Sequence, residues 1–132
     1  MNITGTSIEL MSKDVASAMT FYQSVFGFER LAAEHDEEGK MYWGLLQKDS
    51  FKLSFKEEHR LKSEAIFMRN KSIGATIAIC FQVDDLEGYY DEVLHKCKAL
   101  DHPHLTPCGS HQFSLSDKDG YVITIERFGD QQ

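Results

Sequence analysis

The chain of 132 residues carries the same succession of hydrophobic patterns twice, and this internal repeat constrains its fold more than any other feature. The segment SIELMSKD, Ser7–Asp14, aligns with AICFQVDD, Ala78–Asp85, with apolar residues at matching positions. The segment DSFKLSF, Asp49–Phe55, aligns in the same way with DGYVITI, Asp119–Ile125. The repeat predicts two copies of one β-α-β-β-β unit.

The first unit is organised around an amphipathic helix predicted within the stretch Asp14–Phe28. Asp14 can cap the first free backbone N–H groups, and Gly27 can end the helix because it takes the left-handed conformation without a steric penalty. The positions expected to be buried recur at helical spacing and are Val15, Ala18, Met19, Tyr22 and Phe26. The expected strands are Thr6–Ser12, Phe28–Ala33, Met41–Gln47 and Phe51–Lys56.

The second unit follows a polar, charged linker at residues 57–74, which has room for a helical turn. Its helix is capped by Asp84 or Asp85, and the predicted buried stripe is Leu86, Tyr89, Tyr90, Val93 and Leu94. The predicted strands are Thr76–Val83, a short segment around Ala99–Leu105, His111–Ser116 and, after the turn Asp117–Gly120, Tyr121–Glu126. We expect one domain over residues 1–132, made of modules at about 5–56 and 75–127.

The net charge and the cysteine content limit the classes of partner and the cellular compartment that we expect. The formal net charge is −7, from 14 basic and 21 acidic residues, which argues against nucleic acid because phosphate binding needs clustered Lys and Arg. A neutral or cationic small ligand suits this balance better. Cys80, Cys97 and Cys108 form no CxxC pair, and no window approaches the roughly 20 apolar residues of a membrane span. We expect a reduced, cytoplasmic protein with neither a nucleic-acid nor a membrane partner.

Three motifs carry a family resemblance. They are Phe21-Tyr22 followed by Phe26-Gly27-Phe28, then Val83-Asp84-Asp85-Leu86, then Asp117-Lys118-Asp119-Gly120-Tyr121. With them the chain resembles the vicinal oxygen chelate superfamily, which groups glyoxalase I, extradiol dioxygenases, and bleomycin- and fosfomycin-resistance proteins. Phe26 replaces the family's usual Leu, and Lys118 its usual Pro. The resemblance implies an α+β glyoxalase/bleomycin resistance fold, in which two tandem βαβββ repeats form curved mixed sheets around a cavity.

The resemblance also implies a homodimer, with half-shells that pair either within one chain or between chains. Enzymes of the family hold a divalent metal on side chains from the first and fourth strands of each unit. Transferred by position, the four ligand sites fall on Ser7, Ser54, Ala78 and Thr124. A neutral hydroxyl is a poor ligand and alanine offers no donor, so we expect no metal and no other cofactor. The chain is closest in character to metal-free members that resemble bleomycin-resistance proteins.

Alternation along the strands predicts the lining of the cavity. The predicted ligand-binding residues are Ser7, Glu9, Met11, Trp43, Lys52, Ser54, Cys80, Gln82, Gln112, Ser114 and Thr124, and Ala78 and Val122 share these faces. Glu9 stands out because a carboxylate in a partly apolar cavity costs free energy unless it is paired. It binds a cation or a donor-rich ligand, meets Lys52, or reaches bulk water.

Other candidate residues have a structural interpretation beside the functional one. Trp43, Tyr42 and Phe67 are flat walls for a planar ligand or ordinary core and interface aromatics. His102, His104, Cys108 and His111 match no common zinc spacing, and prolines and a glycine mark the segment as a loop. Cys80 is a nucleophile candidate, but with no base predictably near it we expect an inert thiol.

These observations favour a binding protein that sequesters a small organic compound, either cationic or aromatic, without catalytic residues. Sequestration needs affinity and no chemistry, so the loss of metal ligands costs it nothing. The alternative is an enzyme of glyoxalase type, a lyase or isomerase, with a relocated metal or with acid–base chemistry from Glu9. A purely structural role has only the expected dimerisation in its favour.

Overall fold

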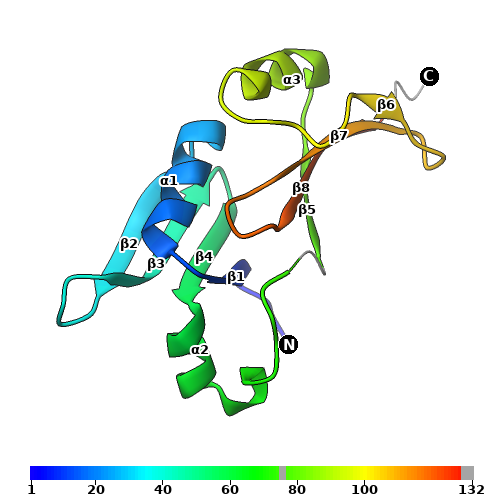
Figure 1. Ribbon diagram of the computed structural model, residues 1–132. Coiled ribbons are helices and arrows are strands. Elements are labelled where there is room, and N and C mark those ends of the chain that lie inside the picture. The colour runs from blue at the N-terminus through cyan, green and yellow to red at the C-terminus, as the bar shows by residue number, and fades with distance from the viewer. Residues whose placement is uncertain (75–76, 129–132) are drawn as a thin grey trace. The chain divides into compact units, whose positions relative to one another are not determined.

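The computed structural model describes residues 1–74 and 77–128 (Figure 1). The chain divides into two compact units, Met1–Ile73 and Gly74–Gln132. The first contains β1 (Ser7–Ser12), α1 (Val15–Phe26), β2 (Glu29–His35), β3 (Met41–Lys48), β4 (Phe51–Glu57), α2 (Glu58–Glu64) and the 3-10 helix η1 (Ile66–Met68). The second contains β5 (Ala78–Gln82), α3 (Leu86–Leu94), β6 (His104–Leu105), β7 (Ser110–Ser116) and β8 (Val122–Phe128). The predicted β-α-β-β-β repeat is confirmed.

Each unit has one mixed sheet of four strands, with the orders β1-β4-β3-β2 and β5-β8-β7-β6. The first strand of each unit runs parallel to the last, and the remaining neighbours are antiparallel. The register preserves the repeat, because Glu9 lies opposite Ser54 in the first sheet and Cys80 lies opposite Thr124 in the second. The predicted α+β class is confirmed.

Helix α1 covers one face of the first sheet. Asp14 caps it as predicted, with Oδ1 accepting the backbone N–H of Ser17 at 3.1 Å, and Gly27 ends it at φ 76°. Its buried side chains are Val15, Ala18, Met19, Phe21, Tyr22 and Val25. The ring centroid of Tyr22 lies 5.3 Å from that of Phe55 on β4, which fixes the contact between helix and sheet.

Phe26 is only half-buried, so its place in the predicted stripe is wrong. It stands in the last turn of α1, beside Gly27, and its ring packs against Tyr22 and Phe28 at centroid distances of 5.8 and 6.5 Å. Phe21 and Val25 are buried instead, because the apolar arc of α1 is wider than the spacing rule assumes.

Helix α3 covers the second sheet through a narrower line than predicted. Asp85 caps it, accepting the backbone N–H of Gly88 at 3.1 Å, and only Leu86 and Val93 are buried. These residues are two turns apart and therefore face the same way. The predicted burial of Tyr89 and Leu94 is wrong, since their exposed fractions are 43% and 48%. A helix of nine residues packs along one line, and these two side chains lie outside it.

Tyr90, the remaining residue of that predicted stripe, is half-buried. Its ring packs edge-on against Phe113 of β7 at a centroid distance of 5.0 Å. This contact joins the helix to the second sheet, as the pair formed by Tyr22 and Phe55 does in the first unit, although Phe113 lies on β7 and Phe55 on β4.

Local hydrogen bonds explain where several elements begin. Asp117 Oδ1 accepts the backbone N–H groups of Asp119 and Tyr121, both at 2.9 Å, so the predicted turn is present and β8 begins only at Val122. The linker contains α2, whose N-terminus is capped by Glu57, so the expected helical turn is confirmed. Thr76, the predicted start of a strand, lies outside the described residues.

Gly44 on β3 provides a test of the packing between α1 and the first sheet. A Cβ atom there would clash with the buried Sδ of Met19. We expect Gly44→Ala to lower the free energy of unfolding by about 1–3 kcal/mol, as overpacking of a core does, measured by urea denaturation. Gly5→Ala is the matched control, because nothing lies within 4 Å of its added Cβ. Equal stability of the two variants would contradict this packing.

Candidate functional site

A hydrogen-bonded cluster of Glu9, Trp43 and Ser54, here called the Glu9 cluster, lies on the face of the first sheet opposite α1. Leu53 and Phe55 face the helix, so Ser54 between them faces away. The Oε1 atom of Glu9 accepts hydrogen bonds from the indole N–H of Trp43 at 3.2 Å and from the Ser54 hydroxyl at 3.3 Å. Three strands, β1, β3 and β4, thus contribute to one carboxylate site.

The carboxylate of the cluster is accessible although its two hydrogen-bond donors are buried or half-buried. Ser54 is 5% exposed and Trp43 is half-buried, whereas Glu9 is exposed. The second carboxylate oxygen of Glu9, Oε2, accepts no hydrogen bond from the described residues. Nor does an ion pair join Glu9 to Lys52 in the part of the chain that the structure describes, so of the alternatives open from the sequence, pairing with Lys52 is not the one observed. The cluster presents a fixed negative group beside an indole ring.

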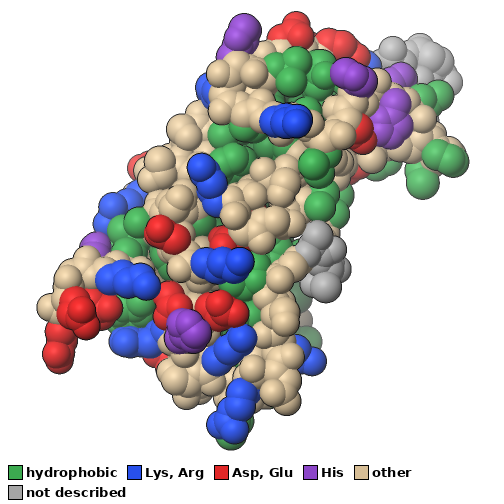
Figure 2. Space-filling model, in the orientation of Figure 1, with side chains coloured by type: hydrophobic (Ala, Val, Ile, Leu, Met, Phe, Trp, Pro, Cys, Tyr) green, Lys and Arg blue, Asp and Glu red, His purple; other side chains and the backbone are tan. Residues whose placement is uncertain are grey.

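The other residues predicted for this face are placed around the cluster. Ser7 and Lys52 lie opposite each other and are exposed, whereas Met11 is buried. Lys56 follows on the same face, and its Nζ forms an ion pair with Glu64 of α2 at 2.7 Å. Around α2 and the hairpin of β2 and β3, acidic and basic side chains are interspersed (Figure 2).

The second sheet gathers the remaining predicted residues on its face opposite α3. The hydroxyl groups of Ser114 and Thr124 are hydrogen-bonded at 2.9 Å, and Cys80 lies opposite Thr124. Gln82 and Gln112 lie one row further along, on either side of Glu126. Because the observed register pairs these positions across neighbouring strands, these predicted residues share one face.

Glu126 is a site residue that sequence reasoning missed. It is 9% exposed, and its Oε2 accepts a hydrogen bond from the Gln82 side-chain amide. It stands two residues after Thr124 on β8, so the alternation that placed Thr124 on this face also placed Glu126 there. The predicted strand ends at Glu126, whereas β8 continues to Phe128.

Several aromatic and histidine candidates are exposed or have other partners. Phe67 is 77% exposed on η1, and the Tyr42 ring stacks with Arg60, whose Cζ is 3.8 Å from the ring centroid. His102 Nδ1 is hydrogen-bonded to the Tyr90 hydroxyl at 2.8 Å, and His104 Nδ1 to the His102 carbonyl oxygen at 2.8 Å. Among the described residues no three His, Cys, Asp or Glu side chains are placed to hold a metal.

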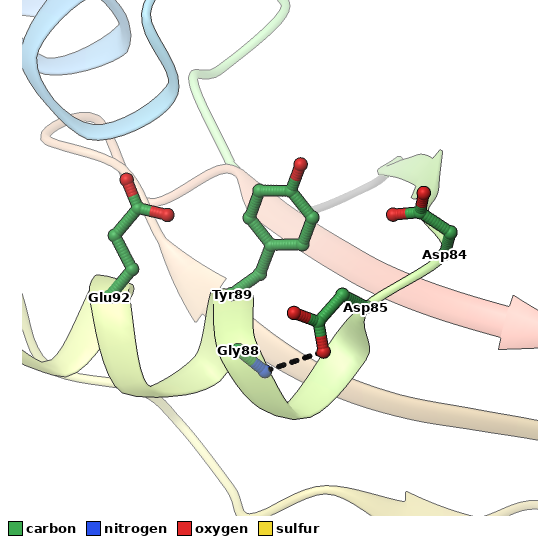
Figure 3. Close-up of a pocket in the computed structure, with 5 residues that line it drawn as sticks. All are labelled: Asp84, Asp85, Gly88, Tyr89 and Glu92. Atoms are coloured by element: carbon green, nitrogen blue, oxygen red, sulfur yellow. Dashed lines mark hydrogen bonds between the residues drawn. The ribbon is translucent and has the colours of Figure 1, made fainter.

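An acidic depression beside α3 contains none of the predicted ligand-binding residues (Figure 3). It is lined by Asp84, Asp85, Gly88, Tyr89 and Glu92. The Asp85 carboxylate is occupied in capping the helix through the backbone N–H of Gly88. This depression is therefore a feature of the helix start.

Comparison with known proteins identifies the superfamily of the chain. The model of the Glyoxalase/Bleomycin resistance protein/Dioxygenase superfamily matches residues 6–125, and the chain belongs to this superfamily. A search of curated proteins finds no match. No helix among residues 1–74 and 77–128 is both long enough and apolar enough to cross a membrane.

Solved structures share the fold at low sequence identity. A glyoxalase/bleomycin resistance protein/dioxygenase family enzyme from Burkholderia phytofirmans PsJN is 16% identical with TM-score 0.75, over 93% of this chain and 97% of that one. A glyoxalase/bleomycin resistance protein/dioxygenase from Nocardioides is 10% identical with TM-score 0.81, over 100% and 87%. TioX from Micromonospora sp. ML1 is 14% identical with TM-score 0.70, over 96% and 99%.

The donors at the positions where the family holds its metal do not fit a divalent ion. Ser7 and Ser54 offer neutral hydroxyl groups, Ala78 offers none, and Thr124 is hydrogen-bonded to Ser114. The Ser54 hydroxyl itself donates a hydrogen bond to Glu9. In each of the two sheets, these positions therefore offer only uncharged groups.

The environment of Cys80 disfavours its thiolate form. Cys80 is exposed, but the partial burial of its thiol still raises the pKa of the thiol, and the negative charge of Glu126 raises it further. A thiolate is the nucleophilic form of cysteine, so this thiol is weakly reactive near neutral pH. This agrees with the inert thiol expected from the sequence.

The link between Cys80 and Glu126 can be tested by alkylation with iodoacetamide in a chain carrying Cys97→Ser and Cys108→Ser. Because the Glu126 charge raises the pKa of Cys80, we expect Glu126→Gln to lower that pKa. The alkylation rate, which increases with pH as the thiolate forms, should then increase at a lower pH. The exposed Glu87→Gln is the control and leaves the profile in place. A profile that does not move in Glu126→Gln would refute the assigned cause.

Proposed function

We propose that the protein binds a small organic molecule that carries a positive charge and a planar group, and that it acts by sequestration. The observation that carries this proposal is the Glu9 carboxylate, held at Oε1 by Trp43 and Ser54 while Oε2 accepts no hydrogen bond from the described residues. A ligand that donates to Oε2 would complete the hydrogen bonding of the carboxylate.

The Glu9 cluster supports recognition of such a ligand in two ways. Its carboxylate is already oriented by two donors, so little conformational freedom is lost when a ligand binds. The indole ring of Trp43 is half-buried beside it, and an indole attracts a planar cation through its π face. The net charge of −7 favours the approach of a cation.

The remaining predicted ligand-binding residues belong to the same proposal. Ser7 and Lys52 border the Glu9 cluster, and the polar face of the second sheet supplies hydroxyl, thiol and amide groups. We propose that the groups on the first sheet contact uncharged parts of the ligand held at Glu9, and that the hydroxyl and thiol groups on the second sheet contact a ligand bound to that sheet. Because the donors at the family's metal positions do not fit a divalent ion, the proposed binding requires no metal.

Binding can be followed through Trp43, which is the only tryptophan in the chain. We expect 9-aminoacridine, a planar cation near neutral pH, to quench Trp43 fluorescence saturably, and acridine, its neutral analogue, to bind more weakly. Glu9→Gln is expected to weaken 9-aminoacridine binding by about tenfold to a hundredfold, because a hydrogen bond to a charged group is lost.

The matched control for that experiment is Glu37→Gln, in the exposed turn between β2 and β3. It reduces the net negative charge by the same amount as Glu9→Gln and is expected to leave the affinity unchanged. Equal affinities of the two acridines, or an unchanged affinity in Glu9→Gln, would overturn the proposal.

We also propose that residues 1–132 act as one domain, in a cytoplasmic homodimer. Strands β1, β2, β5 and β6 are edges of their sheets, and open edges are commonly covered by a second chain in two-fold dimers. The three cysteines are free, which suits a reducing compartment. Native mass spectrometry at micromolar concentration is expected to detect the mass of two chains, and a monomer at every concentration would contradict the dimer.

A further inference from the structure

Glu126 is a buried carboxylate that forms no ion pair with a described residue. It is 9% exposed, and its one side-chain hydrogen bond comes from the Gln82 amide. No Lys or Arg forms an ion pair with it in the described part of the chain. Its neighbour Arg127 points to the opposite face and lies 3.7 Å from Glu87. A buried charge is costly unless it is paired, so the second sheet holds an uncompensated negative group.

The side chains around Glu126 form a row of hydrogen-bonding groups. Gln82 on β5 and Gln112 on β7 lie directly opposite Glu126 from either side, and His104 continues the row on β6. The side-chain amide N–H of Gln82 donates a hydrogen bond to Glu126, which leaves the side-chain carbonyl oxygen of Gln82 as an acceptor. Glu126 Oε1 accepts no hydrogen bond from the described residues. The row therefore combines a carboxylate oxygen with amide oxygens.

An aromatic ring completes this surface. Phe128 follows Glu126 by two residues on β8, so it shares the same face, and it is 53% exposed. A cation near an aromatic face is attracted by the ring quadrupole. The carboxylate, the amide oxygens and the ring are together suited to an organic cation that has N–H donors.

The repeat makes the uncompensated charge conspicuous. Lys56 occupies the position of the first unit that corresponds to Glu126, and it is neutralised within the chain by Glu64 at 2.7 Å. In the second unit the described residues provide no partner of opposite charge for Glu126. The first unit has an internal ion pair where the second has an open anionic group.

We propose that Gln82, Gln112, Glu126 and Phe128 form a second binding site, separate from the Glu9 cluster, which takes an alkylguanidinium or alkylammonium group. The guanidinium is the better match, because its planar array of N–H donors can reach a carboxylate oxygen and a neighbouring amide oxygen together. This site stands on residues of the second unit alone and does not depend on the function proposed for Glu9.

The test uses methylguanidinium chloride and the full chain, observed by the side-chain amide signals of Gln82 and Gln112 in ¹H–¹⁵N NMR spectra. We expect saturable shifts of both signals with methylguanidinium. Tetramethylammonium chloride, a cation of the same charge without N–H donors, is expected to bind at least about tenfold more weakly, because the hydrogen bonds to charged acceptors are missing. Equal affinity for the two cations would overturn the proposal.

Two variants locate the binding. Glu126→Gln keeps the shape of the side chain and is expected to reduce methylguanidinium affinity by about tenfold or more, whereas Glu37→Gln, at an exposed position in the turn between β2 and β3, leaves it unchanged. Gln112→Met, at a half-buried position, is expected to weaken binding severalfold and supplies the test should Glu126→Gln fail to fold. Unchanged affinity in a folded Glu126→Gln, or in Gln112→Met, would refute the site, and a loss confined to Glu9→Gln would assign binding to the Glu9 cluster instead.

Discussion

The ring contact between Tyr22 of α1 and Phe55 of β4, at 5.3 Å between centroids, determines which face of the first sheet is apolar. Because side chains alternate along a strand, burying Phe55 under the helix directs Ser54 to the other face. Tyr90 and Phe113 do the same in the second unit at 5.0 Å. Each sheet is covered by a helix on one face, and its opposite face is available for polar chemistry.

Much of the fold could be predicted from the sequence because it is fixed by local rules. The Asp14 cap, the Gly27 terminus and the turn at Asp117 each depend on a few neighbouring residues, and the structure has all three. The buried stripe of α3 was predicted poorly, because burial depends on how much of a short helix the sheet can cover. Which indole or hydroxyl reaches Glu9 depends on side chains from three strands, and no spacing rule along the chain contains that information.

The candidate sites differ between the two units although the backbone repeats. Alternation places Glu9 and Ser54 on one face, and Cys80 and Thr124 on the corresponding face. The carboxylate, however, stands on the first strand of one unit and on the last strand of the other, at Glu126. The repeated backbone thus carries two carboxylates in different surroundings, and family membership alone does not specify either one.

The ion pair between Lys56 and Glu64 joins a repeated strand to a helix outside the repeat. Strand β4 and the linker helix α2 are therefore not interchangeable parts. A protein engineered by joining two copies of the first β-α-β-β-β unit without α2 would lose the acid that neutralises Lys56. Helix α2 thus contributes to the electrostatics of the first sheet as well as to the connection between the two repeats.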